Sequence, residues 1–360
     1  MFANFLSMTS LCLTSISINE AFPSPQELRA QIPCLEAHTH FVQKSRKTIE
    51  AILKGLDSRL LIVVGPCSIH DLESAREYAW RLSELASHVS DRFFLVMRTY
   101  FEKPRTSLGW KGFLYDPDLN GSHNLTKGIR LARQLLLELT DMKVPVGSEL
   151  LEAITAPYYS DFLSWGCIGA RTSASPPHRQ LAASLNLPIG FKNSIDGNIK
   201  TPVHAVLSAS RSHVFLGMAN SGQIARIQAE GNPLCHVVLR GGGRKPNYDR
   251  ESVLKTLLLC QQLNVCDKVM IDCSHDNSQG NYLNQVSVFK EVIDQLSENS
   301  SPIKGIMLES HLKEGSQPMV SPLSYGVSIT DPCLDWETTR KIILEAYAQS
   351  FCRGVEKRLR

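Results

Sequence analysis

Residues 60–97 read LLIVVGPCSIHDLESAREYAWRLSELASHVSDRFFLVM, and they decide the fold class of this chain. Two short apolar runs enclose a segment, 72–87, in which apolar residues recur every three to four positions. The runs have the composition of buried strands, and the spacing between them is typical of an amphipathic helix. A strand, a helix and a second strand in close succession predict a βαβ unit with parallel strands.

The same alternation continues along the chain. Strands are expected at Leu60–Val64, Phe93–Met97, Pro145–Ser148, Cys167–Ala170, Pro188–Phe191, His236–Leu239, Val269–Asp272 and Gly305–Leu308. Further helices are expected at Thr39–Leu53, Thr126–Leu139 and Arg250–Leu263. The runs His213–Met218 and Gln223–Gln228 are separated by Ala-Asn-Ser-Gly, which predicts a β-hairpin. Setting the hairpin aside leaves eight strands, the number that closes a (β/α)8 TIM barrel.

We therefore expect an α/β chain in three parts. Residues 1–58 form an N-terminal arm with a helix, residues 59–351 form the barrel with the hairpin inserted near 213–228, and residues 352–360 form a C-terminal tail. The first seventeen residues are moderately apolar, with Met8 as an alternative start. They lack the basic residues of a secretory signal, and they are too short and too rich in Ser and Thr for a membrane span.

Composition narrows the class of protein. Hydrophobic residues make up 43% and charged residues 20%, which is ordinary for a soluble globular protein. A formal net charge of +3 gives no reason to expect nucleic acid or a membrane as a partner. Ten cysteines without a paired C-x-x-C set argue against a zinc finger. Their occurrence in apolar runs favours a reducing, cytoplasmic location over a disulfide scaffold.

A side chain suited to binding metal or phosphate lies just past the end of each expected strand. In chain order these residues are Cys67, Arg98, Glu149, Arg171, Lys192, Arg240, His275 and Glu309. The carboxyl ends of barrel strands open on one face, where active sites of this fold lie. The sequence therefore predicts one site that all of these side chains share.

Four residues could form a metal site within this set: Cys67, His275, Glu309 and, further along the chain, Asp331. Thiolate, imidazole and carboxylate groups together suit one divalent transition metal, such as Mn, Fe, Co or Zn, without selecting among them. Each residue also has an ordinary alternative, as a core cysteine, a hydrogen-bonded loop histidine or a helix-capping acid. Their shared position at strand ends favours the metal.

A second group is basic and consists of Arg98, Lys103, Arg105, Arg171, Lys192 and Arg240. Cations gathered without an equal number of acids indicate a polyanionic ligand, because uncompensated charges repel one another. Guanidinium groups bind phosphate and carboxylate through paired hydrogen bonds. The run Gly241–Gly243 would let the backbone approach a ligand closely. The ordinary alternatives are surface ion pairs for the arginines and a tight turn for the glycines.

The segments around these residues are long and specific. They are GPCSIHD (65–71), MRTYFEKPRTSLGWKG (97–112), IGARTS (168–173), GFKN (190–193), LRGG (239–242), DCSH (272–275), MLESHL (307–312) and SITDPCLDW (328–336). In sequence and order the chain, from about Ile18 to about Phe351, resembles the type I (enterobacterial and yeast-like) 3-deoxy-D-arabino-heptulosonate 7-phosphate (DAHP) synthases. The resemblance implies a (β/α)8 barrel with an N-terminal arm and an inserted hairpin.

The resemblance also implies a transferase that condenses phosphoenolpyruvate with erythrose 4-phosphate and releases phosphate, the first step of the shikimate pathway. By the match, Cys67, His275, Glu309 and Asp331 bind the metal. Phosphoenolpyruvate would contact Arg98, Lys103, Arg171, Lys192 and Arg240, with Glu149 nearby. Arg105 and Thr106 would hold erythrose phosphate. Either Lys103 or His275 could move protons. The alternative hypotheses for the function are a 3-deoxy-octulosonate 8-phosphate synthase, a class II aldolase, and a catalytically silent barrel that binds an amino-acid effector.

Regulation and assembly follow from the resemblance alone. Members of the family occur as dimers and tetramers, so a homodimer or homotetramer is expected, and their aromatic amino-acid effector site involves the hairpin and the arm. Gly217 favours tyrosine as the effector, because tyrosine-sensitive members tend to carry Gly there and phenylalanine-sensitive ones carry Ser. The chain departs from the family pattern at Thr172–Pro176, at Leu151-Glu152 and at an additional Gly243. These changes affect the expected regulation and affinity more than the reaction.

Overall fold

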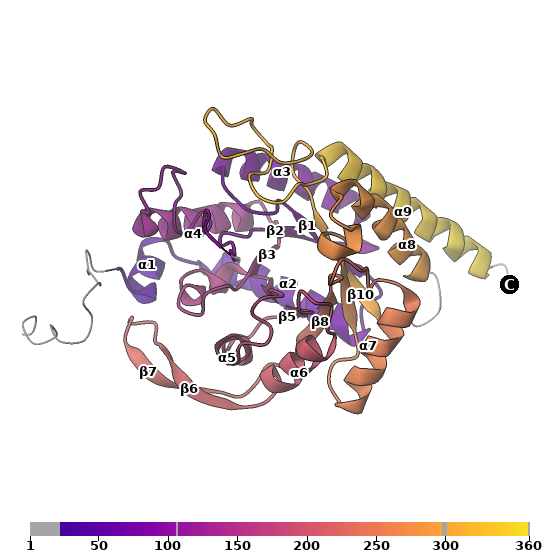
Figure 1. Ribbon diagram of the computed structural model, residues 1–360, viewed down its shortest axis with the longest axis horizontal. Helices are drawn as coiled ribbons and strands as arrows, with labels where there is room; N and C mark the ends of the chain where they lie inside the picture. The colour runs from indigo at the N-terminus through magenta and orange to yellow at the C-terminus, as the bar shows by residue number, and fades with distance from the viewer. Residues whose placement is uncertain (1–21, 106, 297–300, 359–360) are drawn as a thin grey trace, which may run out of the picture.

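The fold is seen in a computed structural model that describes residues 22–105, 107–296 and 301–358, with side chains as far as residue 349. Eight parallel strands form a closed barrel in the order β1-β10-β9-β8-β5-β4-β3-β2 (Figure 1). They are β1 (Leu60–Gly65), β2 (Phe93–Arg98), β3 (Val146–Glu149), β4 (Trp165–Ile168), β5 (Ile189–Lys192), β8 (Cys235–Leu239), β9 (Val269–Asp272) and β10 (Ile303–Glu309). The predicted (β/α)8 barrel is confirmed. β4 begins two residues before the predicted strand, because Trp165 already pairs with Gly147 of β3.

Helices alternate with these strands. They are α3 (Leu72–Val89), α4 (Leu125–Asp141), α5 (Pro176–Ser184), α6 (Lys200–Ala209), α7 (Arg250–Gln262), α8 (Gln285–Leu296) and α9 (Trp336–Arg358). The link from β3 to β4 is formed by two short 3-10 helices, η1 (Ala156–Tyr158) and η2 (Ser160–Phe162). The link that follows β9 contains η3 (His275–Ser278) and η4 (Tyr282–Asn284). The predicted division into arm, barrel and tail stays a prediction, and α9 extends into the segment expected as the tail.

Side chains of the strands alternate between two buried clusters. In β1, Leu61 and Val63 belong to a cluster inside the barrel, whereas Ile62 and Val64 pack outside it among residues of the surrounding helices. This alternation follows from the two-residue period of a strand. Since both faces are buried, the strands appear in the sequence as continuous apolar runs. This is why they could be recognised.

The helix α2 (Glu36–Lys54) confirms the one predicted at Thr39–Leu53. Its residues Ile49, Ile52 and Leu53 join the interior cluster, so the helix closes the barrel at the end opposite the carboxyl ends of the strands. Arg46 fastens α2 to η2, because its guanidinium donates to the carbonyl oxygens of Leu163 and Ser160, each at 2.8 Å. The barrel can therefore receive ligands from its other end.

A polar contact lies inside the barrel. The Trp165 indole donates to Nε2 of His236 at 3.2 Å, and Nδ1 of His236 lies 3.1 Å from the carbonyl oxygen of Leu234. Gly190 makes room for this layer, since a Cβ there would lie 2.8 Å from the Trp165 ring. His236 is fully buried, and burial lowers its pKa to about 4. The imidazole is therefore neutral in the folded protein at pH 7.

This histidine predicts acid destabilisation. In the unfolded chain His236 becomes protonated as the pH falls below about 6.5. In the folded protein it stays neutral until about pH 4, so protonation favours the unfolded state between these two values. Relative to a His236→Gln variant, the wild type should lose up to about 3 kcal/mol of unfolding free energy between pH 7 and pH 4. Urea titrations of both proteins across this range would measure the difference. A difference that does not change with pH would contradict the prediction.

The hairpin lies outside the barrel. Strands β6 (His213–Met218) and β7 (Ile224–Ala229) pair antiparallel, which confirms the predicted hairpin, and they curve toward α1 (Pro25–Gln31) (Figure 1). The amide of Gln26 donates to the carbonyl oxygen of Asn220 in the hairpin turn at 2.8 Å. Ser24 and Glu27 form a capping box that begins α1 at this contact. The arm and the hairpin thus meet on one side of the molecule.

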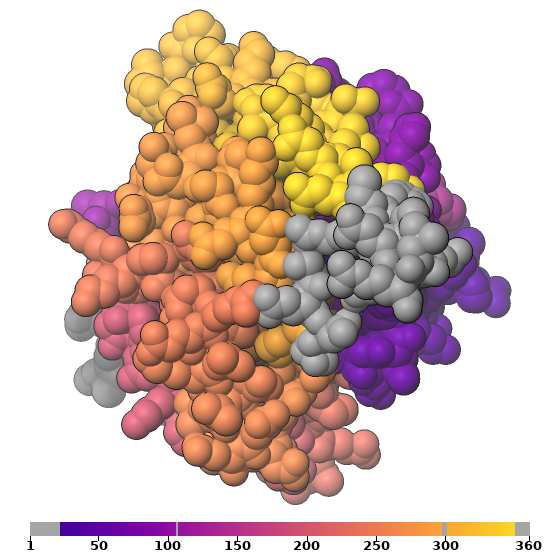
Figure 2. Space-filling view, turned by 90° about the vertical axis from the view of Figure 1, so that its right-hand side faces the viewer, coloured from indigo at the N-terminus to yellow at the C-terminus, as the bar shows by residue number. Residues whose placement is uncertain are grey.

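On the face shown in Figure 2, the orange and yellow segments that contain α8 and α9 lie side by side, and the two helices contact each other. Their apolar residues, such as Phe289 and Ile343, belong to the cluster outside the strands. Among the residues that the structure describes, no helix is both long and apolar enough to cross a bilayer.

Candidate active site

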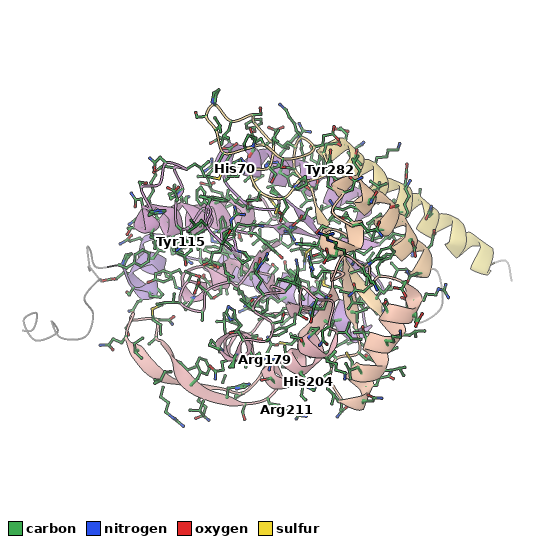
Figure 3. The ribbon with its side chains drawn as sticks, in the orientation of Figure 1. His70, Tyr115, Arg179, His204, Arg211 and Tyr282 are labelled. Atoms are coloured by element: carbon green, nitrogen blue, oxygen red, sulfur yellow. The ribbon has the colours of Figure 1, made fainter. Side chains whose placement is uncertain are left out.

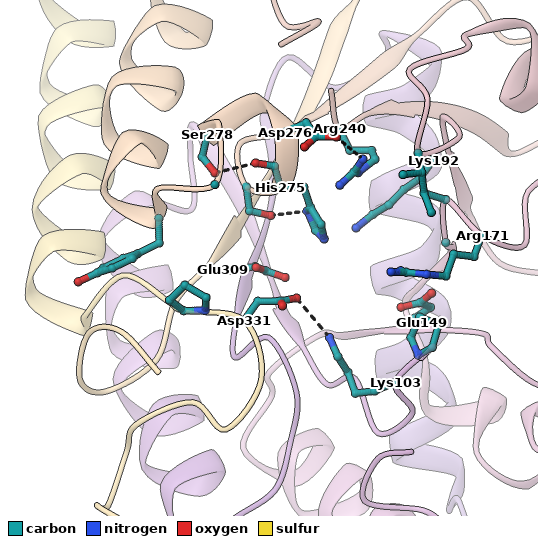
Figure 4. A pocket seen from close by; sticks show the side chains of 18 of the residues that line it. Lys103, Glu149, Arg171, Lys192, Arg240, His275, Asp276, Ser278, Glu309 and Asp331 are labelled. Carbon is teal, nitrogen blue, oxygen red and sulfur yellow. Dashed lines mark hydrogen bonds and ion pairs between the residues drawn. The ribbon is translucent and has the colours of Figure 1, made fainter. Parts of the chain in front are cut away.

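A cavity of about 380 Å³ opens at the carboxyl ends of the strands. The predicted residues that line it are Lys103, Arg105, Glu149, Arg171, Lys192, Arg240, His275, Glu309 and Asp331. Those labelled in Figure 4 point their side chains into one space. Cys67 and Arg98 lie beneath this surface, since Cys67 is fully buried and Arg98 is 1% exposed. Thr106 lies outside the described residues.

The strands position the site directly. Glu149, Lys192 and Glu309 are the last residues of β3, β5 and β10, and all three are buried. Hydrogen bonds between the parallel strands hold these strand ends in register. For example, Gly65 of β1 lies opposite Glu309 of β10. A side chain on a strand end therefore has a nearly fixed origin. Such rigid placement suits a site that must hold its ligands in a defined geometry.

Three of the four predicted metal ligands form a compact group. Ligand atoms of Cys67, Glu309 and Asp331 all lie within 4.8 Å of one another. The Cys67 thiol donates to Oδ2 of Asp331 at 3.3 Å, and Nζ of Lys103 lies 3.0 Å from the sulfur. Burial raises the pKa of Cys67 to about 12, so the thiol keeps its proton until a cation displaces it. One thiol and two carboxylates within reach of a single ion fit a divalent transition metal.

His275 stands beside this group rather than within it. It lines the same cavity, but the compact group of donors contains only the other three predicted ligands among the described residues. Its Nδ1 lies 2.7 Å from Oγ of Ser274 and 3.0 Å from Oδ2 of Asp272. Its backbone φ is +59°, an uncommon conformation for a side chain with a Cβ. The chain turns sharply after β9 and presents the imidazole to the cavity.

Arg98 lies at the predicted strand end, but its guanidinium contacts other residues of the protein and does not line the cavity. Its Nη2 donates to Oε1 of Glu309 at 3.0 Å, and its guanidinium lies 4.0 Å from the centroid of the Tyr100 ring. Its Nε donates to the carbonyl oxygen of Pro66 at 3.3 Å. In this arrangement Arg98 holds a carboxylate of the donor group from below.

Part of the predicted cationic charge is compensated within the protein, although the lysine and arginine side chains of the cavity still outnumber its carboxylates. The cavity is lined by the cations Lys103, Arg105, Arg171, Lys192 and Arg240 and by the carboxylates Glu149, Asp276, Glu309 and Asp331. Arg240 pairs with Asp276 at 3.0 Å, and Lys192 pairs with the buried Asp272 at 2.8 Å. The physical reason is that a cation withdrawn from water is stable only beside a compensating charge.

The run Gly241–Gly243 brings backbone segments of the protein close together. A Cβ on Gly242 would lie 2.1 Å from the backbone nitrogen of Gly197, and one on Gly241 would lie 2.6 Å from the backbone nitrogen of Asn277. The close approach expected from these glycines is therefore between two backbone segments. At Gly169 the space is used differently, because a Cβ there would overlap Oε1 of Glu149.

Comparison with known proteins agrees with this geometry. Residues 36–344 match the model of the DAHP synthetase I family. The chain belongs to the DAHP synthetase I family. It is 44% identical over 326 residues to the Trp-sensitive phospho-2-dehydro-3-deoxyheptonate aldolase of Escherichia coli O157:H7, an alignment that covers 90% of this chain and 93% of that protein.

Other relatives of this DAHP synthetase I family member carry a different effector in their names. The Tyr-sensitive phospho-2-dehydro-3-deoxyheptonate aldolase of Salmonella typhimurium is 43% identical over 335 residues, covering 92% of this chain and 94% of that protein. A solved phospho-2-dehydro-3-deoxyheptonate aldolase from Francisella tularensis superposes with a TM-score of 0.90 at 44% identity, covering 93% of this chain and 98% of that one. The barrel is thus the fold of a solved relative.

Asp272 and Gln285 are among the polar site residues of this family member that the sequence did not predict. Asp272 ends the apolar run of β9, and this position of an acid was the available signal. Gln285 holds Glu309, because its Nε2 donates to the Glu309 carbonyl at 3.2 Å and its Oε1 accepts from the Glu309 amide at 2.9 Å. Nothing in the local sequence distinguishes this glutamine from a surface residue.

The departure from the family pattern at Thr172–Pro176 leaves the cavity wall connected. Oγ of Ser173 donates to the carbonyl oxygen of Lys192 at 2.6 Å, so this loop remains fastened to the end of β5. Ser175 then precedes α5, whose first residue is Pro176, a favourable position for proline.

Proposed function

We propose that this protein is a DAHP synthase, a transferase that joins phosphoenolpyruvate and erythrose 4-phosphate to give DAHP and phosphate, the first step of the shikimate pathway. One observation carries the proposal: a Cys67, Glu309 and Asp331 donor group faces a cavity lined by lysine and arginine side chains in a member of this family. Two anionic substrates and one metal ion are the species that such a site accommodates.

The basic residues divide between the substrates in this proposal. Lys192 ends β5, and Arg171 and Arg240 follow the neighbouring strands β4 and β8. These three residues would bind phosphoenolpyruvate, with Glu149 nearby. Arg98 would support that site through Glu309. Arg105, together with Thr106, would bind erythrose phosphate from the loop that follows β2. The Arg105 Nε already donates to the carbonyl oxygen of Trp110 at 2.8 Å, which sets its direction.

Cys67, Glu309, Asp331 and His275 would hold the metal, which we propose is one divalent ion of Mn, Fe, Co or Zn. When bound, such an ion supplies Lewis acidity toward the aldehyde oxygen of erythrose 4-phosphate. Lys103 would stabilise the Cys67 thiolate, since its ammonium lies 3.0 Å from the sulfur and 3.8 Å from Oδ2 of Asp331. Lys103 Nζ and His275 are the candidates for holding the proton that the aldehyde oxygen receives.

The proposed reaction forms one carbon–carbon bond and breaks one carbon–oxygen bond. The methylene carbon of phosphoenolpyruvate forms a bond to the aldehyde carbon, water adds to the enol carbon, and that carbon's bond to the phosphate oxygen breaks to release phosphate. The arginine and lysine side chains bring together two anions that otherwise repel, and fixing reactants in this way removes much of the entropic barrier.

Release of phosphate from phosphoenolpyruvate tests the proposal. Activity with erythrose 4-phosphate that stops on chelation and returns with Mn²⁺ is expected. Turnover of a five-carbon aldose phosphate in place of erythrose 4-phosphate would indicate that the protein is a 3-deoxy-octulosonate 8-phosphate synthase. Binding of aromatic amino acids without any turnover would favour the silent barrel.

We further propose that an aromatic amino acid binds where the arm meets the hairpin. A cavity of about 590 Å³ lies there, with Phe22, Tyr115, Tyr158 and Met218 in its walls (Figure 3 labels Tyr115). The apolar walls suit an aromatic ring, and the Trp-sensitive and Tyr-sensitive relatives support an effector of this class. Gly217 precedes Met218 and is not among the described lining residues.

Tyrosine is the expected inhibitor, and Gly217→Ser should weaken its inhibition. A Cβ at position 217 would lie 2.9 Å from Cγ1 of Ile227 and 3.2 Å from the Phe215 ring, so a serine displaces side chains of the hairpin that carries Met218. We expect about a tenfold rise in the tyrosine concentration for half inhibition, corresponding to about 1.4 kcal/mol. Dose–response curves with tyrosine, phenylalanine and tryptophan would measure it.

Gln228→Ser serves as the control, because it adds a serine to an exposed position of the same hairpin. Potent inhibition by phenylalanine with none by tyrosine would contradict the assignment. So would equal weakening of inhibition in the two variants.

Assembly and location complete the proposal. The hairpin exposes Val214, Leu216 and Ile224, with exposed fractions of 56%, 79% and 71%, and burial of this apolar face would favour a homodimer or homotetramer. A cytoplasmic location is supported by the cysteines, because those of the described residues are free thiols. Light scattering of the purified protein would give the oligomeric state.

A further inference from the structure

Asp272 is a buried carboxylate at the end of β9, and it contacts groups on both halves of the site. Its side chain has no exposed area. Oδ2 lies 2.8 Å from Nζ of Lys192 and 3.0 Å from Nδ1 of His275. Oδ1 accepts from the amide of Ser274 at 3.0 Å and from its hydroxyl at 2.6 Å. One carboxylate thus joins a lysine of the proposed substrate site to a histidine of the proposed metal site.

Asp272 lies against a cation that compensates its charge. The ammonium of Lys192, itself buried, is 2.8 Å from Oδ2. A buried anion keeps its charge only when its partners stay in place. The carboxylate therefore constrains Lys192 and His275 as strongly as they stabilise it.

The contacts also determine which nitrogen of His275 carries the proton. Both neighbours of Nδ1 are acceptors: Oδ2 of Asp272, and the Ser274 oxygen, whose own proton is donated to Oδ1 of Asp272. These two acceptors favour hydrogen on Nδ1, which leaves on Nε2 the lone pair that can bind a metal. A carboxylate that fixes the tautomer and orientation of a ligating histidine in this way strengthens metal binding.

We propose that Asp272 is a positioning residue that presents His275 Nε2 to the metal and holds Lys192 in place for the anionic substrate. The inference rests on the proposed function, because it assigns a partner to residues of that same site. Asparagine at this position would keep the size of the side chain but would lose the charge that holds the ammonium. Its amide group could also donate to Nδ1, which would permit the other tautomer of the imidazole.

Asp272→Asn, prepared free of metal, tests the inference by binding measurements. We expect its Mn²⁺ dissociation constant to rise about 10–100-fold, the usual effect of losing such a partner of a ligating histidine. We expect phosphoenolpyruvate to bind the metal-free variant about tenfold more weakly. Nitrogen NMR of the imidazole should show Nδ1–H in the metal-free wild type and a mixture of tautomers in the variant.

Asp161→Asn is the matched control. It breaks another ion pair of a buried side chain, since Asp161 binds the fully buried Arg133 through two contacts of 2.7 and 2.9 Å, remote from the donor group. It should lower the melting temperature without changing the Mn²⁺ affinity. A folded Asp272→Asn protein that binds Mn²⁺ as tightly as the wild type would overturn the inference.

Ser274→Ala keeps the inference testable if Asp272→Asn does not fold. This change removes only the hydroxyl between Asp272 and His275, and we expect about a fivefold weaker Mn²⁺ affinity, equivalent to one hydrogen bond. Unchanged affinity in this variant would also overturn the inference. If the wild type itself bound no divalent metal, the proposed function would fail, which is a distinguishable outcome.

Discussion

Replacing Cys67 with alanine is expected to abolish turnover while the barrel remains folded. The change removes the sulfur from the group in which Cys67, Glu309 and Asp331 lie within 4.8 Å of one another. The remaining donors are oxygen and nitrogen, and they would hold a transition metal less tightly. Loss of one buried atom of about methyl size costs only about 1 kcal/mol of stability. Activity should therefore fall far more than stability.

Phosphate release, Mn²⁺ titration and thermal unfolding of the variant would measure both effects. Cys260→Ala is the matched control, because Cys260 is equally buried but lies on α7, away from the site. It should show a similar loss of stability and full activity. For the wild type, chelation should stop turnover and Mn²⁺ should restore it. Full activity of a rigorously metal-free wild type would falsify the metal hypothesis.

The second large effect is expected from the arginines. Arg171→Ala should mainly raise the KM for phosphoenolpyruvate, and Arg105→Ala should mainly raise the KM for erythrose 4-phosphate. The two residues reach the same cavity from different loops, after β4 and after β2. Losing one charge-assisted contact costs roughly 1.5–3 kcal/mol, which corresponds to about one to two decades in kcat/KM.

Steady-state kinetics with each substrate varied in turn would separate the two roles. Arg130→Ala is a suitable control, because Arg130 is exposed on α4 and bonds Gln31 of the arm. It should leave both constants unchanged. If Arg171→Ala and Arg105→Ala altered the two Michaelis constants equally, the proposed division between the substrates would be wrong.

Much of the fold and of the site could be predicted because the signals are local. The strand that ends at Gly65 is visible as a run of apolar residues. The hairpin is visible as two strand-like runs separated by turn residues around Asn220. A closed parallel barrel then brings the carboxyl ends of all strands to one face. Cys67, Lys192 and Glu309 could therefore be assigned to one site before any distance was known.

Charge compensation could not be predicted, because it depends on distances between remote residues. Cys67 and Asp331 are separated by 264 positions, yet their side chains lie 3.3 Å apart. The segment that carries Asp331 is brought there by pairing between Ser310 and Leu334, which has no periodic pattern.

The sequence by itself determined the strands, their order of appearance and the reactive residues at their ends, since each depends on near neighbours. Only the tertiary structure decided which partners those residues take. It turned Arg98 toward Glu309, and it placed Asp272 between Lys192 and His275. The physical reason is that a buried charge must be neutralised within a few ångströms, and the compensating group can come from any part of the chain.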